Sequence, residues 1–271
     1  MGANMLLTLL PGWLAVAGFF WILWLIQRRT GNAGIVDVGW AFGIGLLIAY
    51  YAAVLPVSPV RRILVGLVAC AWSFRLGYYL FRRNVGKPEE GRYKTLREKW
   101  GNQADRNLLW FFEAQAVTVI LLSLPAWVAM TNPARVFGIW DVAGVLVLLA
   151  SVGGEAVADH QLAMFKRDLA SKGKTCRAGL WRYSRHPNYF FEWLHWWVYV
   201  LMSIGSPYAW ATVVAPLVML YLLLKVTGIP ATEAQAIASR GDDYREYQRT
   251  TSAFFPWFPR EGQDGAGNQP G

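Results

Sequence analysis

The sequence predicts an all-α membrane protein with about seven transmembrane helices. Of its 271 residues, 55% are hydrophobic and only 16% are charged, whereas a soluble domain carries roughly 25% charged residues. The apolar residues gather in runs close to the ~20 residues that a helix needs to cross the hydrocarbon core of a bilayer. No segment shows the two-residue alternation of a membrane β-barrel.

Seven apolar runs define the expected transmembrane helices. They cover residues 5–27, 36–56, 62–81, 108–130, 137–158, 189–205 and 208–227. The first run has no basic segment before it and ends at Arg28 and Arg29. This pattern is typical of a retained helix rather than a cleaved signal peptide.

The connections between these runs differ sharply in charge. One side of the membrane would hold Arg28 and Arg29, eight basic residues from Arg82 to Arg106, seven from Lys166 to Arg185, and Arg240, Arg245, Arg249 and Arg260. The other side would hold only Arg61, Arg62 and Arg135. Because basic residues are retained in the cytoplasm, we expect an outside N-terminus and a cytoplasmic C-terminus. This asymmetry explains the net charge of +9 without a nucleic-acid partner.

We expect one transmembrane domain over residues 1–258, followed by a disordered tail at 261–271 that is rich in Gly, Gln and Pro. Two cytoplasmic loops, 82–107 and 159–187, are long enough to carry function. A short polar helix is expected within 229–249, after Pro230. Two cysteines and three histidines without a ligand spacing predict neither a disulfide framework nor a metal site.

The most informative segment is Gly179–Trp193, at the entrance to the sixth apolar run. It places cations, an imidazole, an amide and two tyrosines before the run, and the carboxylate Glu192 at its start. Ionisable groups inside a membrane are expensive and by default mark a functional site. Guanidinium and ammonium groups suit phosphates, and aromatic faces suit a flat base. The chain has no Walker or Rossmann glycine pattern, so a nucleotide would bind among helix ends.

Three elements, in the same order, resemble the membrane sterol reductases. They are Asp159-x-Gln161-x-x-x-Phe165-Lys166, then Arg185-His186-Pro187-Asn188-Tyr189 with Glu192, then Gly241-Asp242-Asp243-Tyr244 with Tyr247 before an aromatic-proline run. The whole chain is more similar still to the steroid 5α-reductase-like bacterial proteins. Val36-Asp37-Val38-Gly39-Trp40 and Arg92-Tyr93-x-x-Leu96-Arg97 are typical markers of that group.

The resemblance implies an enzyme that uses NADPH to reduce an enone carbon–carbon double bond in a Δ4-3-keto steroid or similar lipid. The substrate would come from the bilayer, and we expect a monomer in the bacterial inner membrane. The substrate cavity would come mainly from 5–130 and the NADPH site from 155–258. The implied cofactor contacts are Asp159, Gln161, Lys166, Arg167, Tyr183, Arg185, His186, Asn188, Tyr189, Glu192, Trp196, Asp243, Tyr244 and Tyr247.

Asp37 is the first candidate for the catalytic group. Hydride delivery to an enone builds negative charge on the carbonyl oxygen, which a hydrogen-bond donor would stabilise. A carboxylic acid serves as that donor at neutral pH only if burial raises its pKa. Tyr78, Tyr79 and Arg75 in the third run are the second candidates. Four further residues would line the substrate cavity: Trp40, Trp72, Glu113 and Gln115.

Two other functions fit part of the pattern. Membrane methyltransferases of the isoprenylcysteine or phospholipid type share an Arg-His-Pro-x-Tyr element and bind S-adenosylmethionine. That cofactor has no phosphates and needs fewer cations than the seven between Lys166 and Arg185. A transporter or lipid-binding scaffold would show inverted repeats and interrupted helices, and the sequence shows neither. The reductase is therefore the favoured interpretation.

Overall fold

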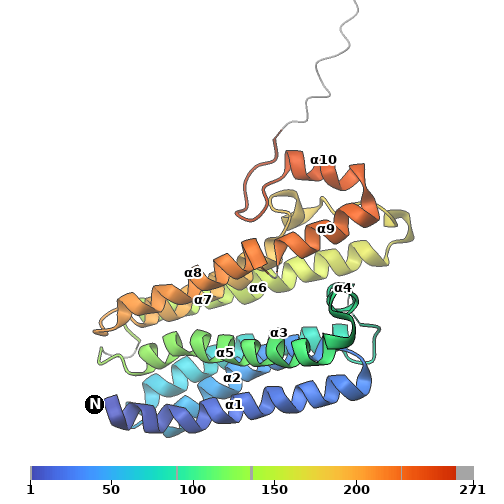
Figure 1. The fold of residues 1–271 in the computed structure, drawn as a ribbon. Coiled ribbons are helices and arrows are strands. Elements are labelled where there is room, and N and C mark those ends of the chain that lie inside the picture. The colour runs from blue at the N-terminus through green and yellow to red at the C-terminus, as the bar shows by residue number, and fades with distance from the viewer. Residues whose placement is uncertain (1, 90, 135–136, 227, 261–271) are drawn as a thin grey trace, which may run out of the picture. The chain divides into compact units, whose positions relative to one another are not determined.

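The computed structural model describes residues 2–89, 91–134, 137–226 and 228–260 (Figure 1). Within these ranges the chain is helical throughout its regular structure and contains no strand. The predicted tail 261–271 and Arg135 lie outside the described residues. The all-α prediction is confirmed.

The described residues include six helical segments that are long and apolar enough to cross a membrane. They are Leu9–Thr30, Ile35–Val54, Pro59–Asn84, Gly91–Met130, Ile139–Arg167 and Ala209–Arg240. The predicted span 189–205 corresponds to α7 (Pro187–Met202), which has only 16 residues. At 1.5 Å per residue it is about 24 Å long, which is shorter than the ~30 Å core. The chain is thus a polytopic membrane protein, with six such segments where the sequence predicts seven.

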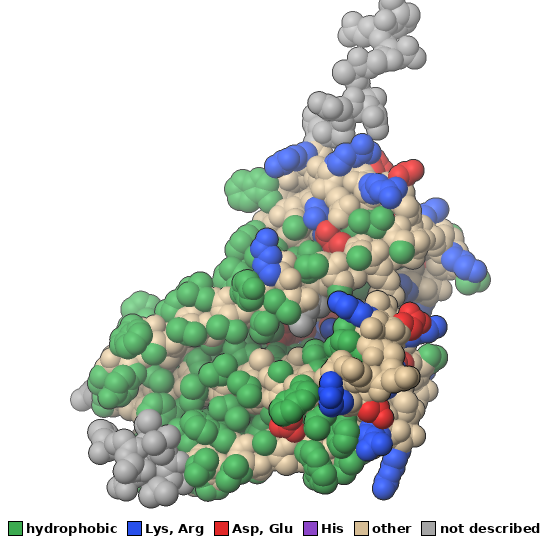
Figure 2. Space-filling model, in the orientation of Figure 1, with side chains coloured by type: hydrophobic (Ala, Val, Ile, Leu, Met, Phe, Trp, Pro, Cys, Tyr) green, Lys and Arg blue, Asp and Glu red, His purple; other side chains and the backbone are tan. Residues whose placement is uncertain are grey.

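Packing divides the chain into two compact units. Unit 1 comprises Met1–Val145 and Val198–Ala215, and unit 2 comprises Leu146–Trp197 and Pro216–Gly271. Hydrophobic side chains cover the surfaces of the long helices, as expected for helices that face lipid (Figure 2).

Unit 1 is built on a bundle of four long helices. These are α1 (Gly2–Thr30), α2 (Ile35–Val54), α3 (Pro59–Asn84) and α5 (Ala104–Met130), and α2 packs against the other three. Gly45 of α2 permits the closest approach to α3, because a Cβ there would lie 2.2 Å from Oγ of Ser73. Small residues commonly allow membrane helices to approach in this way. The bundle core includes Phe20, Ile44 and Phe112.

A buried ion pair joins two distant parts of unit 1. Nη1 of Arg61 lies 2.5 Å from Oδ1 of Asp141, and the two side chains are 2% and 4% exposed. Arg61 also donates to the carbonyl oxygens of Met202 and Ala134. Asp141 lies in the first turn of α6 (Ile139–Arg167), where an acidic residue complements the helix dipole. Its buried partner was not evident from the sequence.

The predicted loop 82–107 contains a helix, α4 (Gly91–Trp100), followed by a short 3₁₀ turn, η1 (Gly101–Gln103). Arg97 of α4 donates to Glu89 and, at 2.6 Å, to Oε1 of Gln27 in α1. Glu89 in turn accepts the backbone N–H of Ala33. These contacts fix the connection onto the ends of α1 and α2.

Two boundaries in unit 2 differ from the prediction. Helix α6 continues nine residues beyond the predicted end at 158, because no Gly or Pro interrupts it before Arg167. The first part of the predicted loop 159–187, residues 159–167, is therefore helical. The expected single polar helix is two helices, α9 (Ile229–Arg240) and α10 (Asp242–Thr250). They break at Gly241, whose φ of +56° favours glycine.

Candidate functional site

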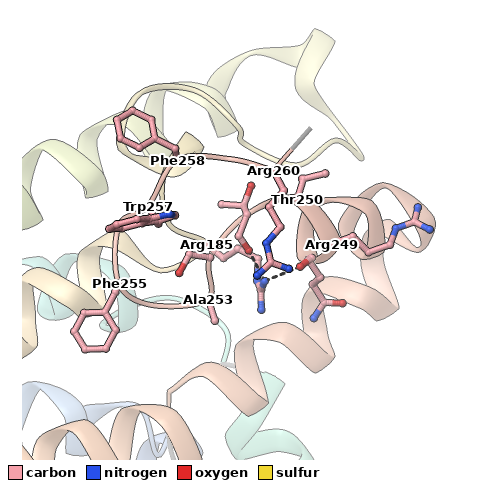
Figure 3. Close-up of a pocket in the computed structure, with 11 residues that line it drawn as sticks. Arg185, Arg249, Thr250, Ala253, Phe255, Trp257, Phe258 and Arg260 are labelled. Carbon is pink, nitrogen blue, oxygen red and sulfur yellow. Dashed lines mark hydrogen bonds between the residues drawn. The ribbon is translucent and has the colours of Figure 1, made fainter. Parts of the chain in front are cut away.

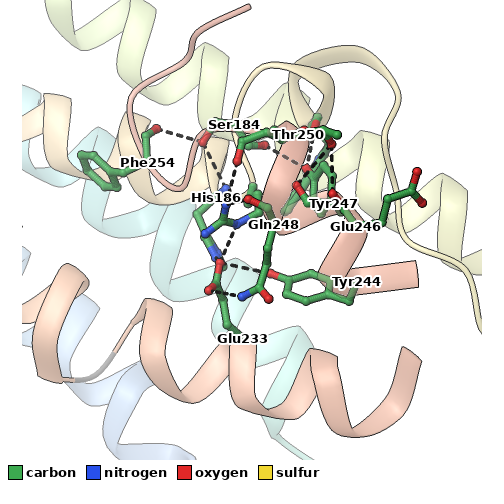
Figure 4. Close-up of polar contacts among 12 residues, drawn as sticks. Ser184, His186, Glu233, Tyr244, Glu246, Tyr247, Gln248, Thr250 and Phe254 are labelled. Atoms are coloured by element: carbon green, nitrogen blue, oxygen red, sulfur yellow. Dashed lines mark hydrogen bonds and ion pairs between the residues drawn. The ribbon is translucent and has the colours of Figure 1, made fainter. Parts of the chain in front are cut away.

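A polar cluster lies in unit 2 where three segments distant in sequence meet (Figure 4). They are the end of α6, the segment 176–186 before α7, and the helices α9 and α10. Oε1 of Gln161 in α6 accepts the backbone N–H of Leu180 at 2.9 Å. The hydroxyl of Tyr247 in α10 donates to the carbonyl oxygens of Trp181 and Ser184. The three predicted motif regions are therefore in contact.

Glu233 of α9 is the centre of this cluster. Its Oε1 accepts from Nε of Arg185 at 2.7 Å, from Nε2 of His186 at 3.2 Å, and from the hydroxyl of Tyr244 at 3.4 Å. Its Oε2 accepts from the amide of Gln248 at 2.7 Å. We call these five residues the Glu233 network. A mostly buried carboxylate with this many donors is stabilised in its charged form.

Arg185, predicted as a cofactor contact, has mainly internal partners. Besides Glu233, its Nη1 donates to the carbonyl oxygens of Gln248 at 3.0 Å and Thr251 at 2.6 Å. Its backbone N–H donates to the carbonyl oxygen of Ser252 at 2.8 Å. Most of its donors thus fix the C-terminal segment, so Arg185 acts first as a positioning residue. A direct contact with the cofactor remains a prediction.

Two buried tyrosines of α10 belong to the same cluster. Tyr244 and Tyr247 are nearly inaccessible, and their rings pack edge to face at 5.8 Å. Burial raises the pKa of both phenols above the usual value of about 10. They therefore stay neutral at physiological pH and serve as hydrogen-bond donors.

His186 stacks on Tyr189 and is almost fully buried. The ring centroids lie 5.3 Å apart with the planes only 6° from parallel. Burial lowers the pKa of His186, although the bond to Glu233 raises it in part. The neutral imidazole then donates through Nε2 to Glu233. Tyr189 is fixed at its other end by Thr232, whose Oγ1 lies 3.1 Å from the phenol oxygen.

The end of α6 carries Asp159 and Gln161 into the cluster. Oδ1 of Asp159 lies 3.4 Å from the amide nitrogen of Asn188 at the start of α7. The Gln161 side chain lies against Gly179, where an added Cβ would be only 2.4 Å away. Gly179 also has a φ of +58°, so both space and backbone require glycine there.

The other predicted contacts have different environments. Glu192 and Trp196 are buried on α7, while Arg167 is exposed at the end of α6. The Tyr183 ring packs edge to face on Phe258. Each lies in unit 2, and their roles toward a cofactor remain predictions.

A group of cations surrounds Cys176 in the segment before α7. The charges of Arg240 and Lys166 act on the Cys176 thiol, although burial is the larger effect and raises its pKa. Arg177 donates to the Asp243 carboxylate at 3.0 Å. Oγ1 of Thr175 and Oδ2 of Asp243 are buried without a hydrogen-bond partner among the described residues. Buried polar atoms of this kind usually have a partner, so this region suits a polar ligand.

A cavity of about 470 Å³ opens beside the cluster (Figure 3). Its lining includes Arg185, Arg249, Arg260, the hydroxyl residues Thr250, Thr251 and Ser252, and the aromatic residues Phe255, Trp257 and Phe258. All of these residues belong to unit 2.

The predicted catalytic residues lie in unit 1. The Asp37 carboxylate is paired with Arg92 of α4 and accepts the hydroxyl of Tyr93 at 2.8 Å. The Arg92 guanidinium and the Tyr93 hydroxyl therefore hold this carboxylate in place, and the catalytic role of Asp37 stays a prediction. Tyr93 is 1% exposed and its hydroxyl is oriented by Asp37. It is the better proton-donor candidate of this pair.

The predicted substrate-cavity residues are brought together only in part. The indole N–H of Trp40 donates to Oγ1 of Thr118, one turn after Gln115, and Trp40 packs on Trp72 at 6.1 Å. Arg75 lies over the Tyr79 ring at 5.6 Å. Glu113 is half-buried on α5.

Two residues of these clusters, Glu233 and Tyr93, were not predicted as site residues from the sequence. Glu233 was assigned only to a polar helix, and Tyr93 only to a family marker. The available signal for Glu233 was a carboxylate three residues after Pro230, with no other acidic residue before Asp242. For Tyr93 no local pattern predicts the pairing, because its partner Asp37 is 56 residues away.

Together the fold and the site define a polytopic helical membrane protein with a cationic polar cluster in unit 2. The chain belongs to the family described as "Protein of unknown function (DUF1295)", which matches residues 23–251. It is 27% identical over 268 residues to "Uncharacterized protein C594.04c" of Schizosaccharomyces pombe, with 87% of this chain and 76% of that protein covered. No solved structure matches the chain. Every predicted site residue lies within the family match.

Proposed function

We propose that the chain is an NADPH-dependent reductase of an activated carbon–carbon double bond in a lipid-like ketone drawn from the bilayer. One observation carries the proposal. The three motif regions that resemble the sterol reductases pack against one another around the Glu233 network. Membership of DUF1295, a family associated with steroid 5α-reductase-like proteins, also supports it.

The residues of unit 2 fit a dinucleotide phosphate. Lys166, Arg177 and Arg240 provide positive charge from three different segments. The buried atoms Oγ1 of Thr175 and Oδ2 of Asp243 lack protein partners among the described residues and are free to bind hydroxyl groups. S-adenosylmethionine has no phosphate to bind Lys166 and Arg240, so the reductase is preferred to a methyltransferase.

When bound, NADPH would supply a hydride. The chain's own contribution is to hold a proton donor for the enolate that the reduction creates. We assign that role to the hydroxyl of Tyr93, whose proton lies in the 2.8 Å hydrogen bond to Asp37 and would pass to the enolate when the hydroxyl turns from Asp37 to the substrate. Arg92 pairs with Asp37 and so fixes the carboxylate beside the phenol.

The test uses detergent-purified protein, NADPH and progesterone as a model enone, with saturated product measured by mass spectrometry. Tyr93→Phe and Asp37→Ala should each lower turnover about 10²-fold, since a transition-state hydrogen bond contributes roughly 3 kcal/mol. NADPH affinity should be unchanged. Tyr208→Phe is the matched control, because Tyr208 is 55% exposed and belongs to no predicted site. Wild-type turnover by Tyr93→Phe would exclude Tyr93 as the donor.

A further inference from the structure

The C-terminal strap, residues 252–260, carries an exposed aromatic surface. Phe255, Trp257 and Phe258 are 51%, 72% and 76% exposed. The strap is nevertheless fixed, because the backbone N–H of Trp257 donates to the carbonyl oxygen of Tyr183 and that of Arg260 to the carbonyl oxygen of Thr250. Large apolar side chains that are exposed on a fixed backbone usually mark a protein or membrane contact.

The same strap lines the cavity beside α10. Figure 3 shows its aromatic side chains along one side, with Arg185 and the end of α10 on the other. Arg249 and Arg260 add positive charge, and neither guanidinium is paired with a carboxylate of the described residues. Lysines and arginines gather around α9 and α10 in the surface view (Figure 2). One cavity thus combines unpaired cations with an apolar wall.

The strap lies at the level where α7 begins. The Phe255 ring packs on Phe190 at 6.1 Å and on Trp193 at 5.6 Å, within the first two turns of α7. The apolar part of α7 follows directly. In membrane proteins, aromatic side chains concentrate at the boundary between the hydrocarbon core and the headgroups of the bilayer.

We propose that this cavity binds the phosphate of an anionic phospholipid, whose acyl chains lie along Phe255, Trp257 and Phe258. The arginines match the phosphate through charge-assisted hydrogen bonds. The aromatic wall favours a lipid over inorganic phosphate, because inorganic phosphate would leave three large apolar side chains in water. The cavity lining does not include Lys166, Arg177 or Arg240, the cations that we assign to NADPH, and the proposal does not depend on the reductase function.

The experiment measures lipid binding to the full chain in detergent micelles by native mass spectrometry. The probes are phosphatidylglycerol, phosphatidylcholine and inorganic phosphate. The double variant Arg249→Gln/Arg260→Gln should weaken phosphatidylglycerol binding roughly 30-fold, as expected for two basic residues at an anionic surface. Arg245→Gln is the matched control, because Arg245 is exposed on α10, pairs with Asp242 and does not line the cavity. It should bind phosphatidylglycerol as the wild type does.

A second variant tests the apolar wall. Trp257→Ala/Phe258→Ala should weaken phosphatidylglycerol binding, and both side chains are exposed enough for the fold to tolerate their loss. If millimolar inorganic phosphate fully displaces phosphatidylglycerol, the cavity binds anions in general and the proposal is overturned. Unchanged phosphatidylglycerol binding by the arginine variant, combined with lost NADPH binding, would instead assign the cavity to the cofactor.

Discussion

Nε of Arg185 donates to Oε1 of Glu233 at 2.7 Å, and the two side chains are only 11% and 14% exposed. This ion pair connects the segment before α7 with α9. Through the carbonyl oxygens of Gln248 and Thr251, Arg185 extends the connection to the end of α10. The Glu233 network therefore holds together the elements that would form the cofactor site.

Glu233→Gln should destabilise the protein by about 3–5 kcal/mol, because it leaves Arg185 largely buried without a counter-charge. The measurement is thermal unfolding in detergent. Glu246→Gln is the control, since the Glu246 carboxylate is 44% exposed and its pair with Arg177 should contribute about 1 kcal/mol or less. Equal melting temperatures for the two variants would contradict the central role of Glu233.

Stability should fall as the pH drops from 7 to 5, in part because of His186. Burial lowers the pKa of His186 in the folded state below its unfolded value of about 6.5. The unfolded chain then binds a proton more readily, so the stabilisation present above pH 6.5 is lost progressively below it.

His186→Gln keeps a donor for Glu233 but cannot titrate. Its melting temperature should therefore depend less on pH over this range than that of the wild type. His160→Gln, at an exposed position of α6, should retain the wild-type slope. An identical slope for His186→Gln would show that His186 does not contribute.

Asp141→Asn should destabilise unit 1 by about 3–5 kcal/mol. The substitution leaves the guanidinium of Arg61 buried without its carboxylate partner. Asp105→Asn serves as the control, because its pair with Arg28 is half exposed and should contribute little. The two variants are compared by thermal unfolding, and a loss below 1 kcal/mol for Asp141→Asn would mean that water reaches Arg61.

Periodicity and apolar length predicted the helices well, because a membrane span is encoded locally by about 20 consecutive residues. The helix boundaries were predicted less well where an apolar run is short or where a helix continues into polar residues. Helix α7 is too short to count as a span, and α6 continues to Arg167 because its polar end contains no helix breaker. The sequence contains Gly241, but it does not predict that this residue takes a positive φ and separates α9 from α10.

The motifs predicted which residues gather in unit 2, but not how they bind one another. Arg185, predicted as a cofactor contact, binds Glu233 and two carbonyl oxygens. Asp37, the first catalytic candidate, is paired with Arg92. These partners are between 48 and 66 residues away in the sequence. A single sequence carries no local signal for such pairs.

The most direct test of the proposed function is the thermal shift of the purified chain with NADPH and, separately, with S-adenosylmethionine. A ligand that binds only the native state stabilises that state by about 2.7 kcal/mol when its free concentration is about 100 times its Kd. We predict a clear rise in melting temperature with NADPH, no rise with S-adenosylmethionine, and a reduced NADPH shift for Lys166→Gln. A rise with S-adenosylmethionine and none with NADPH would contradict the reductase assignment.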